Sequence, residues 1–222
     1  MLMKKIKAVF LDYTGTMIRE DGDDTKKLIE FFMANSDLNH PAEAVAMVWR
    51  LVKQYEMDSY LDNFLTEDEI VDKIIEKCAK EYHLQGDYDY LHVTWQKSWI
   101  YAPLFDDVRP FFEQCPYPIY VIINDGEKYI RKSMEEKGLS PAGIVSAETV
   151  KAYKPHKEIF EEALKVAGCD KEEVVHIGDS IQSDIAGANN AGIKSIFLNR
   201  RNEQIAPDII SAENLMEVLN MI

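Results

Sequence analysis

Residues 9–16 read Val-Phe-Leu-Asp-Tyr-Thr-Gly-Thr, and the rest of the chain is best interpreted from this stretch. The apolar run over residues 6–11, interrupted only by Lys7, predicts a strand buried on both faces. That strand ends at Asp12, followed by two threonines and a glycine. Ligands bind at the carboxyl ends of strands in open α/β sheets, so a carboxylate here indicates a chemical site. Asp, Thr and Gly are also common in turns, so this stretch alone fits an ordinary turn equally well.

Composition and charge limit the classes of protein that fit. The chain has 222 residues, of which 46% are hydrophobic and 29% charged, which suits one large domain or two unequal ones. The net charge of −14 disfavours nucleic acid and anionic membrane partners, because the field of the protein repels polyanions. The start of the chain fits neither a signal peptide nor a membrane span, so we expect a cytoplasmic protein. The widely spaced Cys78, Cys115 and Cys169 match no metal-ligand pattern.

Residues 25–101 have apolar side chains at intervals of three and four, which is typical of helices. This spacing predicts an all-helical domain over residues 18–103. The tryptophans at 49, 95 and 99 follow it and are expected to pack in a core. Asp23, Asp24 and Thr25 are expected to cap the first helix. Pro41 is expected to open the second helix in its first turn, and Thr66 with Glu69 to form a capping box at the start of the third.

After Pro103 the pattern alternates between strands and helices. Apolar runs predict strands over 119–123, 143–146, 174–177 and 194–198, with helices over 108–115, 127–137, 157–166 and 183–191. Repeated β-α units imply a parallel sheet with helices on both faces. The predicted fold class is therefore α/β, a doubly wound, Rossmann-like sheet built from residues 1–17 and 104–222. The helical domain is inserted after the first strand, and we expect it to cap the crevice at the strand ends.

Four polar clusters lie at the ends of predicted strands, at residues 12–16, 124–126, 154–155 and 178–184. Their order is Asp-x-x-Gly-Thr, then Asn, then Lys-Pro, then Gly-Asp-Ser-x-x-x-Asp followed by Gly-Ala-x-x-Ala-Gly-Ile. This series resembles the haloacid dehalogenase-like hydrolase superfamily with a helical cap. The similarity spans almost the whole chain, and the last motif is the most specific part of it.

The resemblance implies magnesium-dependent phosphatase chemistry that passes through an aspartyl-phosphate. Asp12 would be the nucleophile. Mg²⁺ would be held by Asp12, the backbone carbonyl of Thr14 and Asp179, with Asp184 completing its surroundings. Lys154 would hold the phosphoryl oxygens and offset the carboxylates. The residues expected to face the phosphate are Thr16, Asn124, Lys154 and the amides of Asp125 and Gly126.

The carboxylates and histidines near these clusters also have structural interpretations. Asp179 and Asp184 fit a helix cap and a first-turn acid equally well. His176 lies inside a predicted strand and is expected to be a hydrogen-bonded core residue, whereas His156, close to Lys154, could touch the phosphate.

Two positions depart from the phosphatases of this superfamily. Thr14 stands at the catalytic position where they have a second aspartate, which protonates the leaving group and then activates water. Threonine cannot do this near neutral pH, and such a loss costs about 10²- to 10⁴-fold in rate. The related ion-pumping ATPases have Asp-x-Thr-Gly-Thr, so a phosphorylated aspartate remains compatible with this loop. Ile123 stands where the superfamily has a Ser or Thr that binds the phosphoryl group.

These departures leave three functions open. The first is a magnesium-dependent hydrolase of a small phosphate ester or anhydride, acting as a monomer or homodimer. The second is a phosphate- or metal-binding regulatory protein that has lost turnover. The third is a haloacid dehalogenase-like activity, in which the halide leaves without a proton. Against the third, the dehalogenases have Tyr where this chain has Thr14, and they lack the Gly-Asp-Ser motif.

Overall fold

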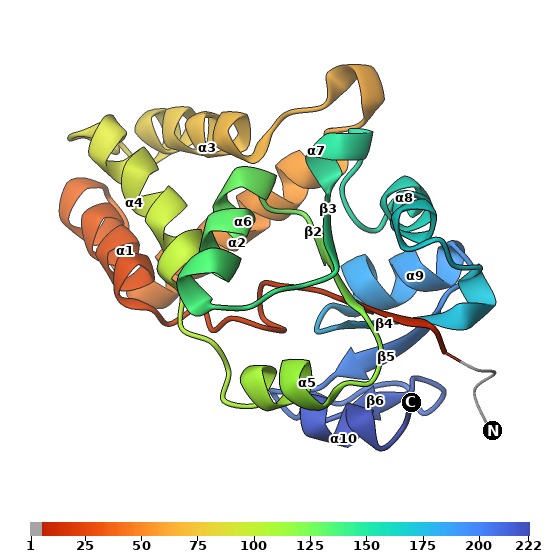
Figure 1. Cartoon of the computed structure of the whole chain (residues 1–222). Coiled ribbons are helices and arrows are strands. Elements are labelled where there is room, and N and C mark those ends of the chain that lie inside the picture. Colours follow the sequence, from red (N-terminus) through yellow and green to blue (C-terminus); the bar gives the residue numbers. More distant parts are fainter. Residues whose placement is uncertain (1–5) are drawn as a thin grey trace.

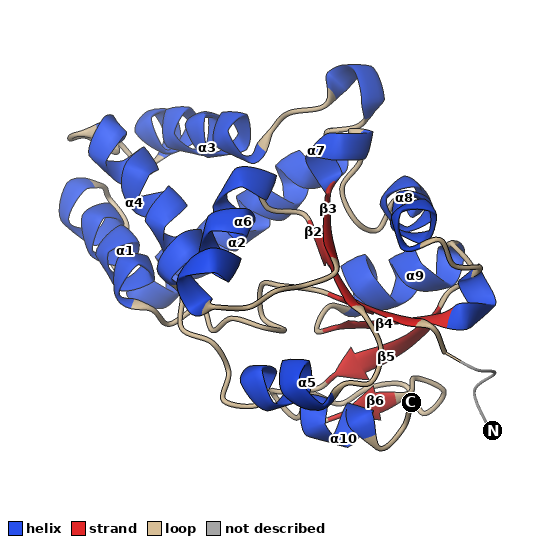
Figure 2. Cartoon of the chain, viewed as in Figure 1, coloured by secondary structure: helices blue, strands red, loops and turns tan. Residues whose placement is uncertain are grey.

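A computed structural model describes residues 6–222, and its centre is one parallel sheet of six strands. The strand order is β3-β2-β1-β4-β5-β6, with β1 between its two neighbours in the middle of the molecule. Helices α5 (Val108–Gln114), α6 (Glu127–Lys137) and α10 (Leu215–Leu219) lie on one face, and α8 (Lys157–Ala167) and α9 (Gly187–Asn190) lie on the other (Figure 1; Figure 2). The predicted doubly wound α/β fold is therefore confirmed. The strands are β1 (Ala8–Leu11), β2 (Ile119–Ile123), β3 (Gly143–Ser146), β4 (Val174–Gly178), β5 (Lys194–Leu198) and β6 (Ser211–Ala212).

The strand register brings three of the four predicted polar clusters, at residues 12–16, 124–126 and 178–184, to one edge of the sheet. The fourth, at residues 154–155, was expected at the end of a strand but follows none, because β3 ends at Ser146 and the short helix α7 (Ala147–Val150) comes next. Leu11 of β1 pairs with Val121 of β2 on one side and with Ile177 of β4 on the other. The residues that follow these strands therefore emerge side by side. Every residue of β1 is buried, as expected for a strand covered on both faces.

The helical insert between β1 and β2 consists of α1 (Asp23–Asn35), α2 (Pro41–Asp58), α3 (Glu67–Glu81) and α4 (Tyr88–Tyr101). Pro41 opens α2, and Thr66 and Glu69 form the predicted capping box of α3. The predicted cap of α1 is wrong. Gly22 is its N-cap, and no side chain caps it. Asp23 and Asp24 lie instead in the first turn, where carboxylates offset the helix dipole.

Tryptophan packing in the insert follows the helical pattern only in part. Trp95 and Trp99 of α4 are buried, as predicted. Trp49 of α2 is 37% exposed, so its expected place in the core is wrong. Spacing alone shows that residues share a face of a helix, but not how far the neighbouring helices cover that face.

The four predicted helices of the α/β part are present, with one change near β4, and two short helices, α7 and α10, were not predicted. The helices of this part are α5 (Val108–Gln114), α6 (Glu127–Lys137), α7 (Ala147–Val150), α8 (Lys157–Ala167), α9 (Gly187–Asn190) and α10 (Leu215–Leu219). The helix expected over 183–191 begins earlier, as a π-helical segment over Ile181–Ala186 that leads into α9. Ser180 caps this segment, because its side chain accepts a hydrogen bond from the Ser183 amide.

Among residues 6–222, no helix has the length and apolar character needed to cross a membrane. The expectation about the start of the chain falls largely on residues 1–5, which lie outside the described residues.

Candidate active site

Asp12 lies at the carboxyl end of β1 and opens a tight loop. Its amide donates to the Ile177 carbonyl of β4 at 2.9 Å, which extends the strand pairing by one residue. Gly15 in this loop has a φ of +82°, a conformation that favours glycine. A Cβ atom at Gly15 would lie 2.2 Å from a carboxylate oxygen of Asp179. Glycine therefore lets the loop approach the carboxylate that follows β4.

Three carboxylates converge at this edge of the sheet. Asp12, Asp179 and Asp184 each offer an oxygen, and these oxygens lie within 4.8 Å of one another. Asp184 comes from the π-helical segment, which folds back over Gly178. A Cβ at Gly178 would lie 2.3 Å from the carboxyl carbon of Asp184. Asp179 and Asp184 are thus part of one cluster with Asp12, and Ser180 is the residue that caps the following helical segment.

Lys154 is the buried cation of the cluster. Its ammonium nitrogen lies 2.5 Å from Asp12 Oδ1 and 2.7 Å from Asp184 Oδ1. Burial opposes its charge, but the two carboxylates hold the pKa of Lys154 above its usual range. His176 Nε2 lies 3.0 Å from the same Asp184 oxygen, so His176 is the hydrogen-bonded core residue that was predicted. Although burial acts in the opposite direction, Lys154 and His176 hold the pKa of Asp184 below its usual range.

The charge and the free oxygen of this cluster fit a divalent cation. When ionised, the three carboxylates carry two more negative charges than the ammonium group of Lys154 offsets, and at least one remains in excess when Arg201, 3.8 Å from Asp179, is counted. Burial and the neighbouring Asp12 raise the pKa of Asp179 to about 8. Asp12 Oδ2 is buried and has no hydrogen-bond partner among the described residues. A hard cation such as Mg²⁺ prefers carboxylate oxygens and would offset the excess charge, so the residues present suit magnesium.

Thr14 contacts a carboxylate that the sequence did not single out. Its hydroxyl lies 3.2 Å from Asp125 Oδ2 and donates a hydrogen bond to it. Burial and the charge of Asp12 raise the pKa of Asp125 to about 6. The sequence had suggested a role only for the Asp125 amide. The orientation of a side chain just after a strand is decided by the loop, which the apolar pattern does not reveal.

The other predicted phosphate-facing residues have different surroundings. Thr16 is buried, with its hydroxyl 3.5 Å from Asp179 Oδ1. The side chain of Asn124 accepts a hydrogen bond from the Lys154 amide at 2.8 Å and donates to Glu56 of α2 at 3.1 Å. Asn124 therefore joins the Lys154 loop to the helical insert. Gly126 is the N-cap of α6.

The insert contributes charged side chains near the carboxylate cluster. Glu56 is buried and pairs with Lys53 at 2.9 Å. Glu67 of α3 is also buried, and burial raises its pKa well above the usual value, with the charge of Glu56 adding to the shift. These two positions could not be recognised from the sequence, because charged residues on a helix usually indicate a solvated face.

The loop after β5 reaches the same edge of the sheet. Arg201 lies 3.5 Å from a carboxylate oxygen of Glu20 and 3.8 Å from one of Asp179. Burial raises the pKa of Glu20 to about 7. His156 lies elsewhere, stacked on the ring of Tyr60 with centroids 4.3 Å apart. No hydrogen bond joins His156 to the cluster within the described part of the chain, so its expected contact with the phosphate is not supported.

Comparison with known proteins agrees with this arrangement. The family model of the haloacid dehalogenase-like hydrolases matches residues 6–192. YfnB of Bacillus subtilis is 23% identical, with 99% of this chain and 97% of YfnB covered. A glyceraldehyde 3-phosphate phosphatase of Methanothermobacter thermautotrophicus is 36% identical over 72 residues, which is 32% of each chain. This chain thus matches about a third of the length of that phosphatase and nearly all of YfnB.

Solved structures share the fold over nearly the whole chain. The crystal structure of YfnB, which was determined with magnesium bound, has a TM-score of 0.79 at 21% identity and covers 98% of this chain and 99% of its own. L-2-haloacid dehalogenase from Xanthobacter autotrophicus has a TM-score of 0.78 at 15% identity and covers 97% and 98%. At these identities the likeness concerns the fold alone. With the family model matching residues 6–192, the chain belongs to the haloacid dehalogenase-like hydrolases.

Proposed function

We propose that this protein is a magnesium-dependent hydrolase of a small phosphorylated metabolite, acting through an aspartyl-phosphate on Asp12. The observation that carries the proposal is the state of the Asp12 carboxylate. One of its oxygens is bound by Lys154, and the other is buried without a partner among the described residues, beside Asp179 and Asp184. Several relatives of this chain are phosphatases, which supports a phosphate substrate.

The reaction follows from the residues around Asp12. A carboxylate oxygen of Asp12 forms a bond to phosphorus, while the bond from phosphorus to the leaving oxygen breaks and its electron pair departs with the leaving group. Water then attacks phosphorus, the bond to Asp12 breaks, and phosphate is released. Lys154 orients Asp12 and stabilises the negative charge on the phosphoryl oxygens. Asp12, the Thr14 carbonyl, Asp179 and Asp184 would hold magnesium, which would supply the positive charge that lets the two anions approach.

Thr14 limits the kind of leaving group. Its hydroxyl donates to Asp125 and has no acidity near neutral pH with which to protonate a departing alkoxide. A leaving group that departs as a stable anion needs no such proton. We therefore favour acyl phosphates and phosphoanhydrides over simple alkyl phosphates as substrates.

The helical insert, residues 18–103, is proposed to act as a cap over the core formed by residues 1–17 and 104–222. Its contacts with the core surround the site: Glu56 with Asn124, Asp68 with Lys128, and Tyr60 with Glu158. A cap in this position would exclude bulk water during the reaction. We place the protein in the cytoplasm, as a monomer or homodimer.

The proposal is tested by phosphate release from acetyl phosphate, p-nitrophenyl phosphate and sugar phosphates, with magnesium and with a chelator. An Asp12→Asn variant is the control. Turnover that needs magnesium and is lost in the variant supports the proposal. A folded protein that binds magnesium and phosphate but releases none from any substrate would favour the binding protein instead. Halide release from 2-chloropropionate without metal would favour a dehalogenase.

A further inference from the structure

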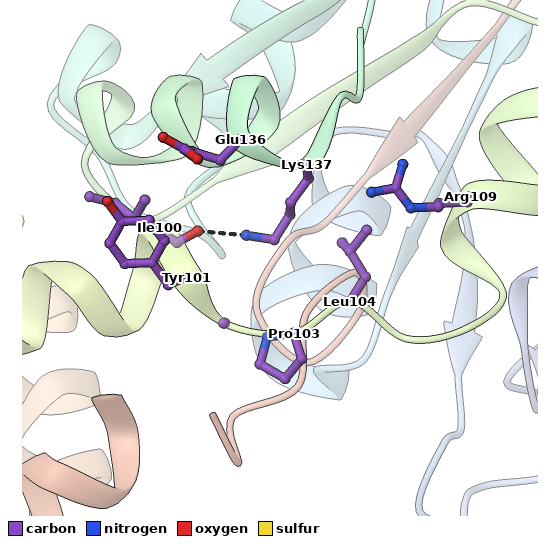
Figure 3. Close-up of a pocket in the computed structure, with 8 residues that line it drawn as sticks. Ile100, Tyr101, Pro103, Leu104, Arg109, Glu136 and Lys137 are labelled. Atoms are coloured by element: carbon purple, nitrogen blue, oxygen red, sulfur yellow. Dashed lines mark hydrogen bonds between the residues drawn. The ribbon is translucent and has the colours of Figure 1, made fainter. Parts of the chain in front are cut away.

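A pocket of about 360 Å³ lies on the core at the end of the helical insert, and none of the three clustered carboxylates lines it. It is lined by the segment that returns from α4 to the core, residues 100–104, and by side chains of α5 and α6. Figure 3 shows the guanidinium of Arg109 of α5 pointing toward the side chain of Lys137 of α6, whose ammonium points to the Ile100 carbonyl. Its volume is at the lower end of the range of small-molecule sites, about 300–1,000 Å³.

The two cations of this pocket have no anionic partner. Lys137 donates to the Ile100 carbonyl and to the Ser133 hydroxyl, each at 2.5 Å, and both acceptors are neutral. Arg109 forms no ion pair or hydrogen bond through its side chain within residues 6–222. The nearest acid on the lining, Glu136, directs its carboxylate away from Lys137 (Figure 3). Both cations line the same pocket, and neither forms an ion pair among residues 6–222.

Lys137 is held in place rather than free in solvent. It is partly buried, and burial lowers its pKa to about 8, so it still carries its proton at neutral pH. Two of its three N–H groups are used by Ile100 and Ser133, which leaves one for a ligand. The exposed Arg109 brings a planar guanidinium that binds phosphate oxygens in pairs.

We propose that Arg109 and Lys137 form a second anion site that binds the phosphate group of a small molecule. Both side chains line the same pocket, and a phosphate dianion would balance the charge of two cations and accept charge-assisted hydrogen bonds from them. This site is separate from the proposed hydrolase reaction and does not depend on it.

The position of the site indicates what its occupation would do. The segment that lines it pairs with the segment that enters the insert, through hydrogen bonds from Arg19 to Pro103 at 2.8 Å and from Phe105 to Met17 at 3.0 Å. Lys137 is also joined, through Ser133, to Tyr13, the residue after Asp12. A bound phosphate would tie α5 and α6 to residues 100–104, the segment that returns from the insert, and would oppose movement of the insert relative to the core.

The test is calorimetric titration of the metal-free protein with inorganic phosphate, in the presence of a chelator. Without magnesium the excess negative charge at Asp12 repels phosphate, and no turnover occurs. We expect Arg109→Gln and the double variant Arg109→Gln/Lys137→Gln to bind phosphate about tenfold more weakly than the wild type. The matched control, Arg50→Gln/Lys80→Gln, removes the same charge from exposed helix positions of the insert and should bind as the wild type does.

Equal affinity in the wild type and in Arg109→Gln, or no binding to the wild type, would overturn the proposal. Arg109 is exposed, so its single variant remains informative if the double variant fails to fold. Parallel titrations with glycerol 3-phosphate and succinate identify the ligand. Tighter binding of inorganic phosphate supports a product of the reaction as the ligand, and tighter binding of glycerol 3-phosphate supports a phosphorylated metabolite. Binding of succinate alone would contradict a phosphate site.

Discussion

The ammonium nitrogen of Lys154 lies 2.5 Å from Asp12 Oδ1, and both side chains are buried. Lys154 also donates to Asp184 Oδ1 at 2.7 Å, so two buried carboxylates share one cation. Removing one partner of a buried ion pair leaves an uncompensated charge, which is far more costly than losing an exposed pair. The charge balance of the site therefore depends on Lys154.

Replacing Lys154 by Met should destabilise the metal-free protein by about 3–5 kcal/mol and abolish phosphate release. Urea unfolding with a chelator measures the first effect. Lys165→Met is the matched control, since its ammonium makes an exposed pair with Glu162 and its loss should cost no more than about 1 kcal/mol. A Lys154→Met protein as stable as this control would show that the buried pair is not needed.

Magnesium should stabilise the protein more at pH 8 than at pH 6. The pKa of Asp179 is 3.8 in its ordinary state and about 8 in the folded, metal-free protein. The folded protein therefore keeps a proton that the unfolded chain releases, and its free energy of unfolding falls as the pH rises from about 4 to 8. Magnesium binds the ionised form and competes with this proton. The measurement is the shift in Tm caused by magnesium at each pH. In Asp179→Asn the difference between the two pH values should disappear, and an unchanged difference would assign it to another group.

Replacing Gly15 by Ala should weaken magnesium binding by about tenfold or more, because the new methyl group would lie 2.2 Å from a carboxylate oxygen of Asp179. Gly138→Ala is the matched control, because it introduces backbone strain without a steric clash. Gly138 also has a positive φ, +62°, but nothing lies within 4 Å of its Cβ position. Both variants should lose about 1–2 kcal/mol of stability. Only Gly15→Ala should need more magnesium for the same rise in Tm, and equal behaviour of the two would contradict the close approach.

Asn124→Ala and Glu56→Ala should be energetically coupled, because the Asn124 amide donates to the Glu56 carboxylate at 3.1 Å. A double-mutant cycle in urea should give a coupling free energy of at least about 0.5 kcal/mol. Asn124→Ala combined with Lys165→Met, whose positions share no hydrogen bond, should give additive effects. Additivity of the first pair would show that Asn124 does not hold the insert.

The α/β sheet could be predicted from the sequence because each buried parallel strand is a short apolar run. Asp12 and Asp179 were found for the same reason, since each follows one of the predicted strands. Lys154 follows no strand and was found only through the Lys-Pro motif of the family. The two-residue β6 escaped prediction, because two residues carry no periodicity.

The parts of the site that come from other elements could not be predicted in this way. Glu56 and Glu67 lie on helices far from the strand ends in sequence, and only the packing of the insert brings them near Asn124 and Asp125. The contact between Thr14 and Asp125 depends on the direction of two loop side chains. Apolar spacing records which face of an element is buried, but not which polar groups meet across a crevice.

The most direct test of the proposed mechanism is to trap the phosphorylated enzyme. The protein is mixed with acetyl phosphate and magnesium, quenched in acid, reduced with borohydride and analysed by peptide mass spectrometry. Borohydride converts an aspartyl-phosphate to homoserine. Homoserine is therefore expected at position 12 in the wild type and not in Asp12→Asn. Phosphate release with no modification at position 12, or with modification at another carboxylate, would contradict the assignment of Asp12 as the nucleophile.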